Sequence, residues 1–144
     1  LRVSRIKHKL KNIDEVISKI KKLMPSTFNE FDALDIIKDG IYKNVEFAIQ
    51  SVMDICEIIN VDLFLGIPEN EDTLVKNLEK NRILSGSIVN KLISMKGFRN
   101  ALVHRYEDID DEKAFNAITK GINDFGLFSK EVNNFLDKRR KQKK

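Results

Sequence analysis

The recurrence of apolar residues at intervals of three and four positions is the feature that most limits how this chain can fold. Such spacing places apolar side chains along one face of an α-helix. The first stripe lies between Arg2 and Met24 and comprises Ile6, Leu10, Ile13, Ile17, Ile20 and Leu23. No segment shows the two-residue alternation of a half-buried β-strand. The pattern therefore predicts an all-α protein.

The same spacing predicts further helices along the chain. A long one is expected over 32–60, a short one over 72–80, another from about 87 to Asn100 or beyond, and a closing one over 110–138. Only two prolines and six glycines interrupt these segments, which favours long helices joined by few loops. We therefore expect an up-down bundle of four to five helices.

Residues 61–70 hold Gly66 and Pro68 and are expected to form a loop. The helix after this loop needs a side chain that accepts hydrogen bonds from its free N-terminal amide groups. Thr73 or Asp72 could provide that cap.

The length of 144 residues is typical of one domain. We expect a single helical domain over 1–137 and a basic tail over 138–144. No run approaches the roughly 18 apolar residues of a membrane span, and the first residues are amphipathic, unlike a signal sequence. Cys56, the single cysteine, lies in an apolar stripe and is expected to be a small core residue. The expected location is the cytoplasm.

The net charge of +4 is unevenly distributed. Basic residues gather in the tail 138–144 and on the first predicted helix, which also carries His8, expected at the surface. Such clusters attract phosphate backbones. A solvated helix end explains them equally well, so charge alone leaves both interpretations open.

The segment from Arg99 to Tyr106 gathers two cations, an amide, an imidazole and a phenol in eight positions. On an ideal helix Asn100 and His104 share a face, whereas Arg99 lies about 140° from His104. Arg99 and His104 therefore converge only if the helix ends or bends near Val103, or if a second copy of the chain completes the site.

These residue types suit phosphodiester cleavage. His104 could exchange a proton with an RNA 2′-hydroxyl or a leaving oxygen near neutral pH. Arg99 could hold the phosphate, and Asn100 could orient either group. No metal or cofactor is required for this reaction, and no carboxylate cluster suggests one. The alternative is structural, because cationic side chains also favour the free carbonyl groups of a last helical turn.

The order of elements around this segment resembles the HepT branch of the HEPN superfamily. The family pattern is Arg-Asn-x-x-x-His-x-Tyr at a helix end, followed by an acidic turn and a closing helix. Here it is preceded by the helix from Arg2, the helix over 32–60, Pro68 and the segment Leu84-Ser85-Gly86. The resemblance spans nearly the whole chain.

The resemblance implies a metal-independent endoribonuclease that works as a homodimer, with its two motifs in a cleft between subunits. Carried over by position, Arg99 and His104 would be catalytic and Asn100 supporting. Arg105 could join the basic cleft or simply be solvated. The family also implies an MNT nucleotidyltransferase antitoxin as partner. That antitoxin would adenylylate Tyr106, placing bulk and negative charge where substrate phosphate must lie.

Two other functions are compatible with the sequence. Some HEPN relatives resemble non-catalytic modules that bind nucleotides or assist a nucleotidyltransferase. The chain could also be a purely structural helical dimer whose Arg-His pair caps a helix. The phenylalanines from Phe115 to Phe135 are expected in the core or at a dimer interface.

Overall fold

The computed structural model of the protein describes residues 1–104 and 108–142. Within these ranges the chain forms seven helices and no strand, which confirms the predicted all-α fold. The helices are α1 (Val3–Leu23), α2 (Phe28–Asp32), α3 (Ile36–Asp62), α4 (Glu71–Lys80), α5 (Gly86–His104), α6 (Asp111–Gly121) and α7 (Asp124–Gln142).

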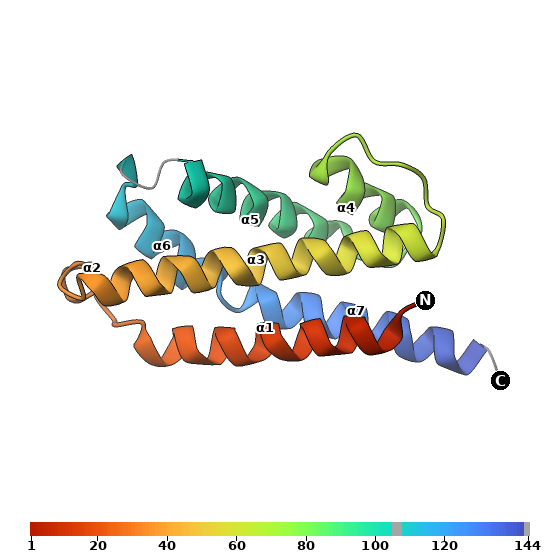
Figure 1. Ribbon diagram of the computed structural model, residues 1–144, viewed down its shortest axis with the longest axis horizontal. Helices are drawn as coiled ribbons and strands as arrows, with labels where there is room; N and C mark the ends of the chain where they lie inside the picture. Colours follow the sequence, from red (N-terminus) through yellow and green to blue (C-terminus); the bar gives the residue numbers. More distant parts are fainter. Residues whose placement is uncertain (105–107, 143–144) are drawn as a thin grey trace.

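The long helix α3 is the centre of the bundle (Figure 1). It packs against α1, α4 and α5, while α7 packs against α1 and α5. The start of α1 and the end of α7 lie at the same end of the molecule (Figure 1). Five residues of the stripe expected in the first helix are buried: Ile6, Leu10, Ile13, Ile17 and Ile20. Burial of this face against α3 and α7 holds α1 in the bundle.

The predicted helix over 32–60 is wrong at its start, because a short helix and a sharp turn precede α3. The helix α2 begins after Thr27, whose hydroxyl accepts a 3.2 Å hydrogen bond from the Glu30 amide and donates a 2.9 Å bond to its carboxylate. This capping arrangement favours a separate helix. Asp35 then has a φ of 54°, a conformation incompatible with a continuous α-helix.

The predicted closing helix over 110–138 is two helices, so the count exceeds the four to five expected. The break lies between Gly121 and Asp124. It allows α6 to pack against α2 and α7 to pack against α1, two surfaces that one straight helix could not both cover. Phe115 and Phe128 remain buried on either side of the break, which confirms core positions for this part of the phenylalanine stripe.

The cap of α4 is neither Thr73 nor Asp72. It is Asn70, whose Oδ1 accepts a 2.9 Å hydrogen bond from the Thr73 amide. Thr73 and Asp72 already lie inside the helix, where their side chains cannot take the N-cap position. At the other end of the chain, α7 continues through Gln142, so residues 138–142 of the expected tail are helical.

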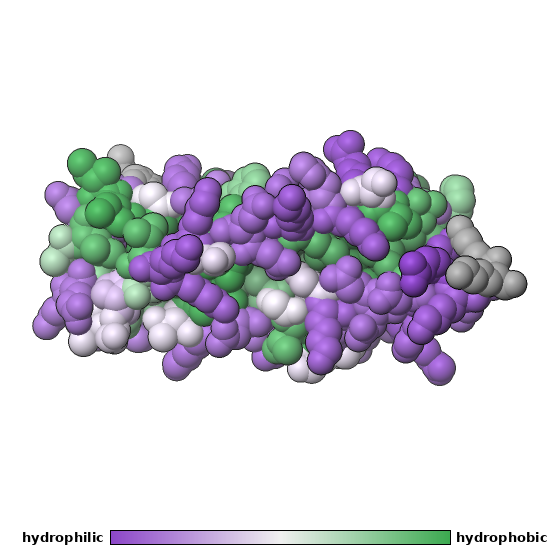
Figure 2. Space-filling model, turned by 90° about the horizontal axis from the view of Figure 1, so that it is seen from below, coloured by the Kyte–Doolittle hydropathy of each residue, from purple (hydrophilic) through white to green (hydrophobic). Residues whose placement is uncertain are grey.

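The surface seen from the α1 side is largely hydrophilic, with apolar side chains gathered toward the end that holds α2 and also toward the opposite end (Figure 2). At the start of α3, Ile36 and Ile37 are exposed. No helix in the part of the chain described here is both long enough and apolar enough to cross a bilayer.

Candidate active site

Arg99, Asn100 and His104 lie in the last two turns of α5, beside α3. All three line one open hollow of about 430 Å³, together with Lys43, Glu46, Phe47, Gln50 and Val103. Arg99 is buried, whereas Asn100 and His104 are exposed. The two residues that an ideal helix separates therefore border the same hollow within one chain.

The guanidinium of Arg99 is held by three side chains from three helices. Its Nη1 donates to Gln50 Oε1 at 3.0 Å and to Glu71 Oε2 at 2.9 Å. Its Nη2 donates to Glu71 Oε1 and, at 3.1 Å, to Asn100 Oδ1. Only 8% of Arg99 is exposed. The bonds to Glu71 raise the pKa of Arg99 and outweigh the opposing effect of burial, so the buried side chain keeps its positive charge.

Glu71 and Gln50 were not anticipated from the sequence. Glu71 lies in the first turn of α4. The helix dipole favours a carboxylate at this position, so the presence of an acid there does not indicate a contact with Arg99. Gln50 is on α3, and no local spacing connects it to the motif. A buried arginine requires an anionic partner, but the sequence alone does not say which of many acids supplies it.

His104 is the last described residue of α5 and its imidazole is exposed. A ligand in the hollow can therefore reach it. The two remaining predicted site residues, Arg105 and Tyr106, lie outside the described residues. His8 is exposed on α1, as expected, and is not among the residues that line this hollow.

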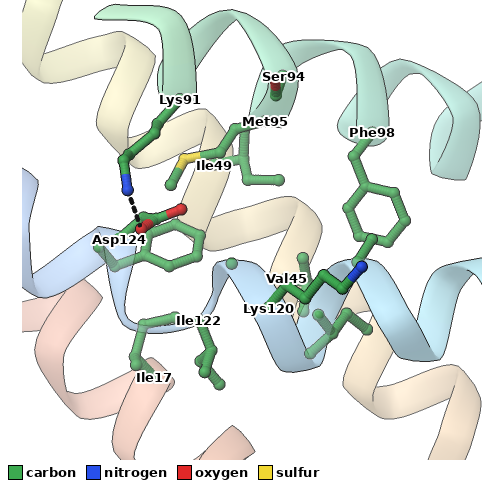
Figure 3. Close-up of a pocket in the computed structure, with 14 residues that line it drawn as sticks. Ile17, Val45, Ile49, Lys91, Ser94, Met95, Phe98, Lys120, Ile122 and Asp124 are labelled. Atoms are coloured by element: carbon green, nitrogen blue, oxygen red, sulfur yellow. Dashed lines mark hydrogen bonds and ion pairs between the residues drawn. The ribbon is translucent and has the colours of Figure 1, made fainter. Parts of the chain in front are cut away.

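A second hollow, of about 280 Å³, lies among α1, α3, α5, α6 and α7 (Figure 3). Its walls are mainly apolar and include Ile49 and Met95, and Lys91 Nζ contacts Asp124 Oδ1 at 3.0 Å on its border. Lys91 and Asp124 are paired with each other, and no histidine is among the described residues that line this hollow, so it offers no imidazole comparable to that of His104 in the first.

Metal ligands and thiols were the other candidate functional groups of the described chain. No group of three or more His, Cys, Asp or Glu side chains within 1–104 and 108–142 could hold a metal ion. Cys56 is fully buried, and burial raises the pKa of its thiol to about 12. It is therefore a core residue, as the sequence predicted, and not a nucleophile.

The family model described as "Ribonuclease HepT-like" matches residues 13–132. Among curated proteins, the chain is 30% identical to the tRNA nuclease HepT of Aphanizomenon flos-aquae over 87 residues, which cover 60% of this chain and 59% of that protein. That match thus spans less than two thirds of the relative. The chain is 24% identical to the mRNA nuclease HepT of Shewanella oneidensis over 121 residues, 84% of this chain and 90% of that protein.

A solved structure shows the same fold. It is a tri-AMPylated HEPN toxin of Shewanella oneidensis in complex with an MNT antitoxin, with a TM-score of 0.81 and 22% identity over 90% of this chain and 97% of that one. The predicted family is confirmed, because the family model covers most of the helical bundle, including α5 and its motif. The chain belongs to the HepT-like ribonuclease family.

Proposed function

We propose that this chain is the ribonuclease toxin of a HepT/MNT-type toxin-antitoxin pair and that it cleaves RNA with Arg99, Asn100 and His104. The observation that carries the proposal is the shared hollow: a fixed cation, an amide and an accessible imidazole border one open space. The names of the curated relatives, a tRNA nuclease and an mRNA nuclease, support RNA as the substrate class.

The chemistry follows from the three side chains. The imidazole of His104 accepts the proton of a 2′-hydroxyl, and the resulting oxygen attacks the adjacent phosphorus. The bond from phosphorus to the 5′-oxygen breaks, which leaves a 2′,3′-cyclic phosphate and a 5′-oxygen that takes up a proton. Arg99 stabilises the charge that accumulates on the phosphate oxygens. Every step can proceed without a metal ion.

A homodimer would place two such hollows in one cleft and would supply a second imidazole for the leaving oxygen. This arrangement can be tested by mixing two inactive variants, Arg99→Ala and His104→Ala. If Arg99 and His104 act across the interface, the mixture regains part of the activity. Sedimentation analysis should show a species of twice 16.7 kDa; a monomer with full activity would contradict the dimeric site.

The cleavage test uses purified protein, an RNA oligonucleotide and excess EDTA. We expect products with 2′,3′-cyclic phosphate ends, and we expect Arg99→Ala and His104→Ala to lower the rate at least about a hundredfold. The matched controls are Arg2→Ala, which removes another arginine paired with a carboxylate, and His8→Ala. Both controls should retain activity. Intact RNA with the wild-type protein would refute the nuclease proposal and favour a non-catalytic nucleotide-binding module.

The proposed partner is an MNT nucleotidyltransferase antitoxin, which would inhibit the toxin by adenylylating Tyr106. Its support is the AMPylated state of the related Shewanella oneidensis toxin. After incubation with ATP and such an enzyme, mass spectrometry should find added AMP on the peptide that contains Tyr106, and none after Tyr106→Phe. Modification that survives Tyr106→Phe would contradict this site.

A further inference from the structure

Every hydrogen on the terminal nitrogens of Arg99 is already used within the chain. Each of these nitrogens carries two N–H groups. Nη1 donates to Gln50 and Glu71, and Nη2 donates to Glu71 and Asn100. A phosphate can therefore bind either nitrogen only by replacing one of these three acceptors.

The three acceptors are arranged differently around the hollow. Gln50 and Asn100 line it together with Arg99, whereas Glu71 does not. Glu71 binds both terminal nitrogens and so occupies the end of the guanidinium, in the two-pronged geometry that suits a carboxylate. A phosphate that enters the hollow meets the two amide side chains before it meets Glu71.

The cost of replacement also differs among the acceptors. An amide group has an oxygen that accepts and an NH2 that donates. Rotation of Gln50 or Asn100 would release Arg99 and turn an N–H toward the incoming phosphate. Removal of Glu71 would instead strip a nearly buried cation of its carboxylate, which is costly. The neutral acceptors are therefore the ones that a substrate displaces.

We infer that Glu71 is a positioning residue for RNA phosphodiester cleavage. It fixes the end of the Arg99 guanidinium, and the side bound by the Gln50 and Asn100 amides stays available to the substrate. This inference rests on the proposed function. An arginine side chain is long and flexible, and its planar group stabilises a transition state only in a defined orientation. Because Glu71 begins α4, the placement of α4 sets that orientation.

The chain offers a matched control beside this pair. Lys96 Nζ lies 2.6 Å from Asp72 Oδ1, so the next residue of α4 forms a second ion pair with α5. Replacement of Glu71 or Asp72 by its amide removes one ion pair from the same contact between helices. Only the first replacement changes the environment of Arg99.

The experiment measures kcat and KM for RNA cleavage by the full chain and its Glu71→Gln, Glu71→Asp and Asp72→Asn variants. We expect Glu71→Gln to lower kcat on the order of a hundredfold, with a smaller change in KM. Glu71→Asp keeps the charge on a shorter side chain and should fall between wild type and Glu71→Gln. Asp72→Asn should stay within about twofold of wild type.

Thermal melts followed by circular dichroism show which variants are folded at the assay temperature, and if Glu71→Gln is not, the comparison is made with Glu71→Asp. A Glu71 variant as active as Asp72→Asn, or one in which only KM changes, overturns the inference while leaving the nuclease intact. A rise in activity would mean that Glu71 restrains Arg99, and this result would also overturn the inference. Absence of cleavage by the wild-type chain overturns both proposals.

Discussion

The hydroxyl of Tyr42, on α3, donates a 2.6 Å hydrogen bond to Oδ1 of Asp111, in the first turn of α6. Oδ2 of Asp111 accepts a 3.1 Å bond from Lys38, also on α3. Both carboxylate oxygens are thus bound to the same helix. Among the described residues, α6 is the next α-helix after α5, which carries His104, and this contact fixes the start of α6 against α3.

Replacement of Tyr42 by phenylalanine should destabilise the protein. Tyr42 is 3% exposed, and its bond ends on a charged acceptor, so we expect a loss of about 1.5–3 kcal/mol in the free energy of unfolding. Urea denaturation measures this change. The control is Asp32→Asn, which removes the more exposed carboxylate partner of Lys38 and should cost less than about 0.5 kcal/mol. Equal losses in the two variants would contradict the assigned role of Tyr42.

Stability should also depend on pH through Asp111. Burial alone would raise the pKa of Asp111, but the hydrogen bonds from Tyr42 and Lys38 outweigh it and lower that pKa. A carboxyl group with a lowered folded-state pKa stabilises the fold fully above its unfolded pKa of about 3.9. The stabilisation is lost as the pH falls from there through the folded value.

Urea denaturation at a series of pH values tests this dependence. Asp111→Asn removes the titrating group, so its free energy of unfolding should change less between about pH 5 and pH 2 than that of the wild type. A variant with the same acid dependence as the wild type would assign the effect to other carboxylates.

Two glycines should respond to alanine substitution in opposite directions. Gly66 has a φ of 106°, which strains any side chain, and its carbonyl accepts a 2.7 Å bond from the buried Asn60. Gly66→Ala should therefore destabilise the protein by about 1 kcal/mol. Gly40 lies inside α3 with open space around its Cα, so Gly40→Ala should stabilise the helix by about 0.5–1 kcal/mol. Thermal melts measure both changes in stability, and a change in the same direction for the two variants would contradict the prediction.

The thiol of Cys56 should resist modification in the folded protein. It is fully buried, and its pKa is raised to about 12 by burial, so neither access nor ionisation favours reaction. We expect an aromatic disulfide reagent to label it only upon unfolding, with the full rate in concentrated denaturant. Rapid labelling of the native protein would show that α3 opens around Cys56.

The sequence alone predicts much of the fold because helical periodicity is a local property. The inward face of α1 follows from its apolar stripe, and the same spacing predicts α4, α5 and most of α3. The apolar spacing does not predict where one helix ends and the next begins. Apolar residues keep their helical spacing through Gly121, and the division between α6 and α7 arises because the two helices pack against different neighbours.

The candidate site divides in the same way between sequence and tertiary structure. The motif and its family order place Arg99, Asn100 and His104 near a helix end, because these residues are close together in the chain. The partner of Arg99 could not be chosen among 22 acidic residues, since nothing local links Glu71 to Arg99. Only the packing of α4 and α3 against α5 brings Glu71 and Gln50 to the guanidinium. A buried charge must be paired, and the folded arrangement of the helices decides which residue pairs with it.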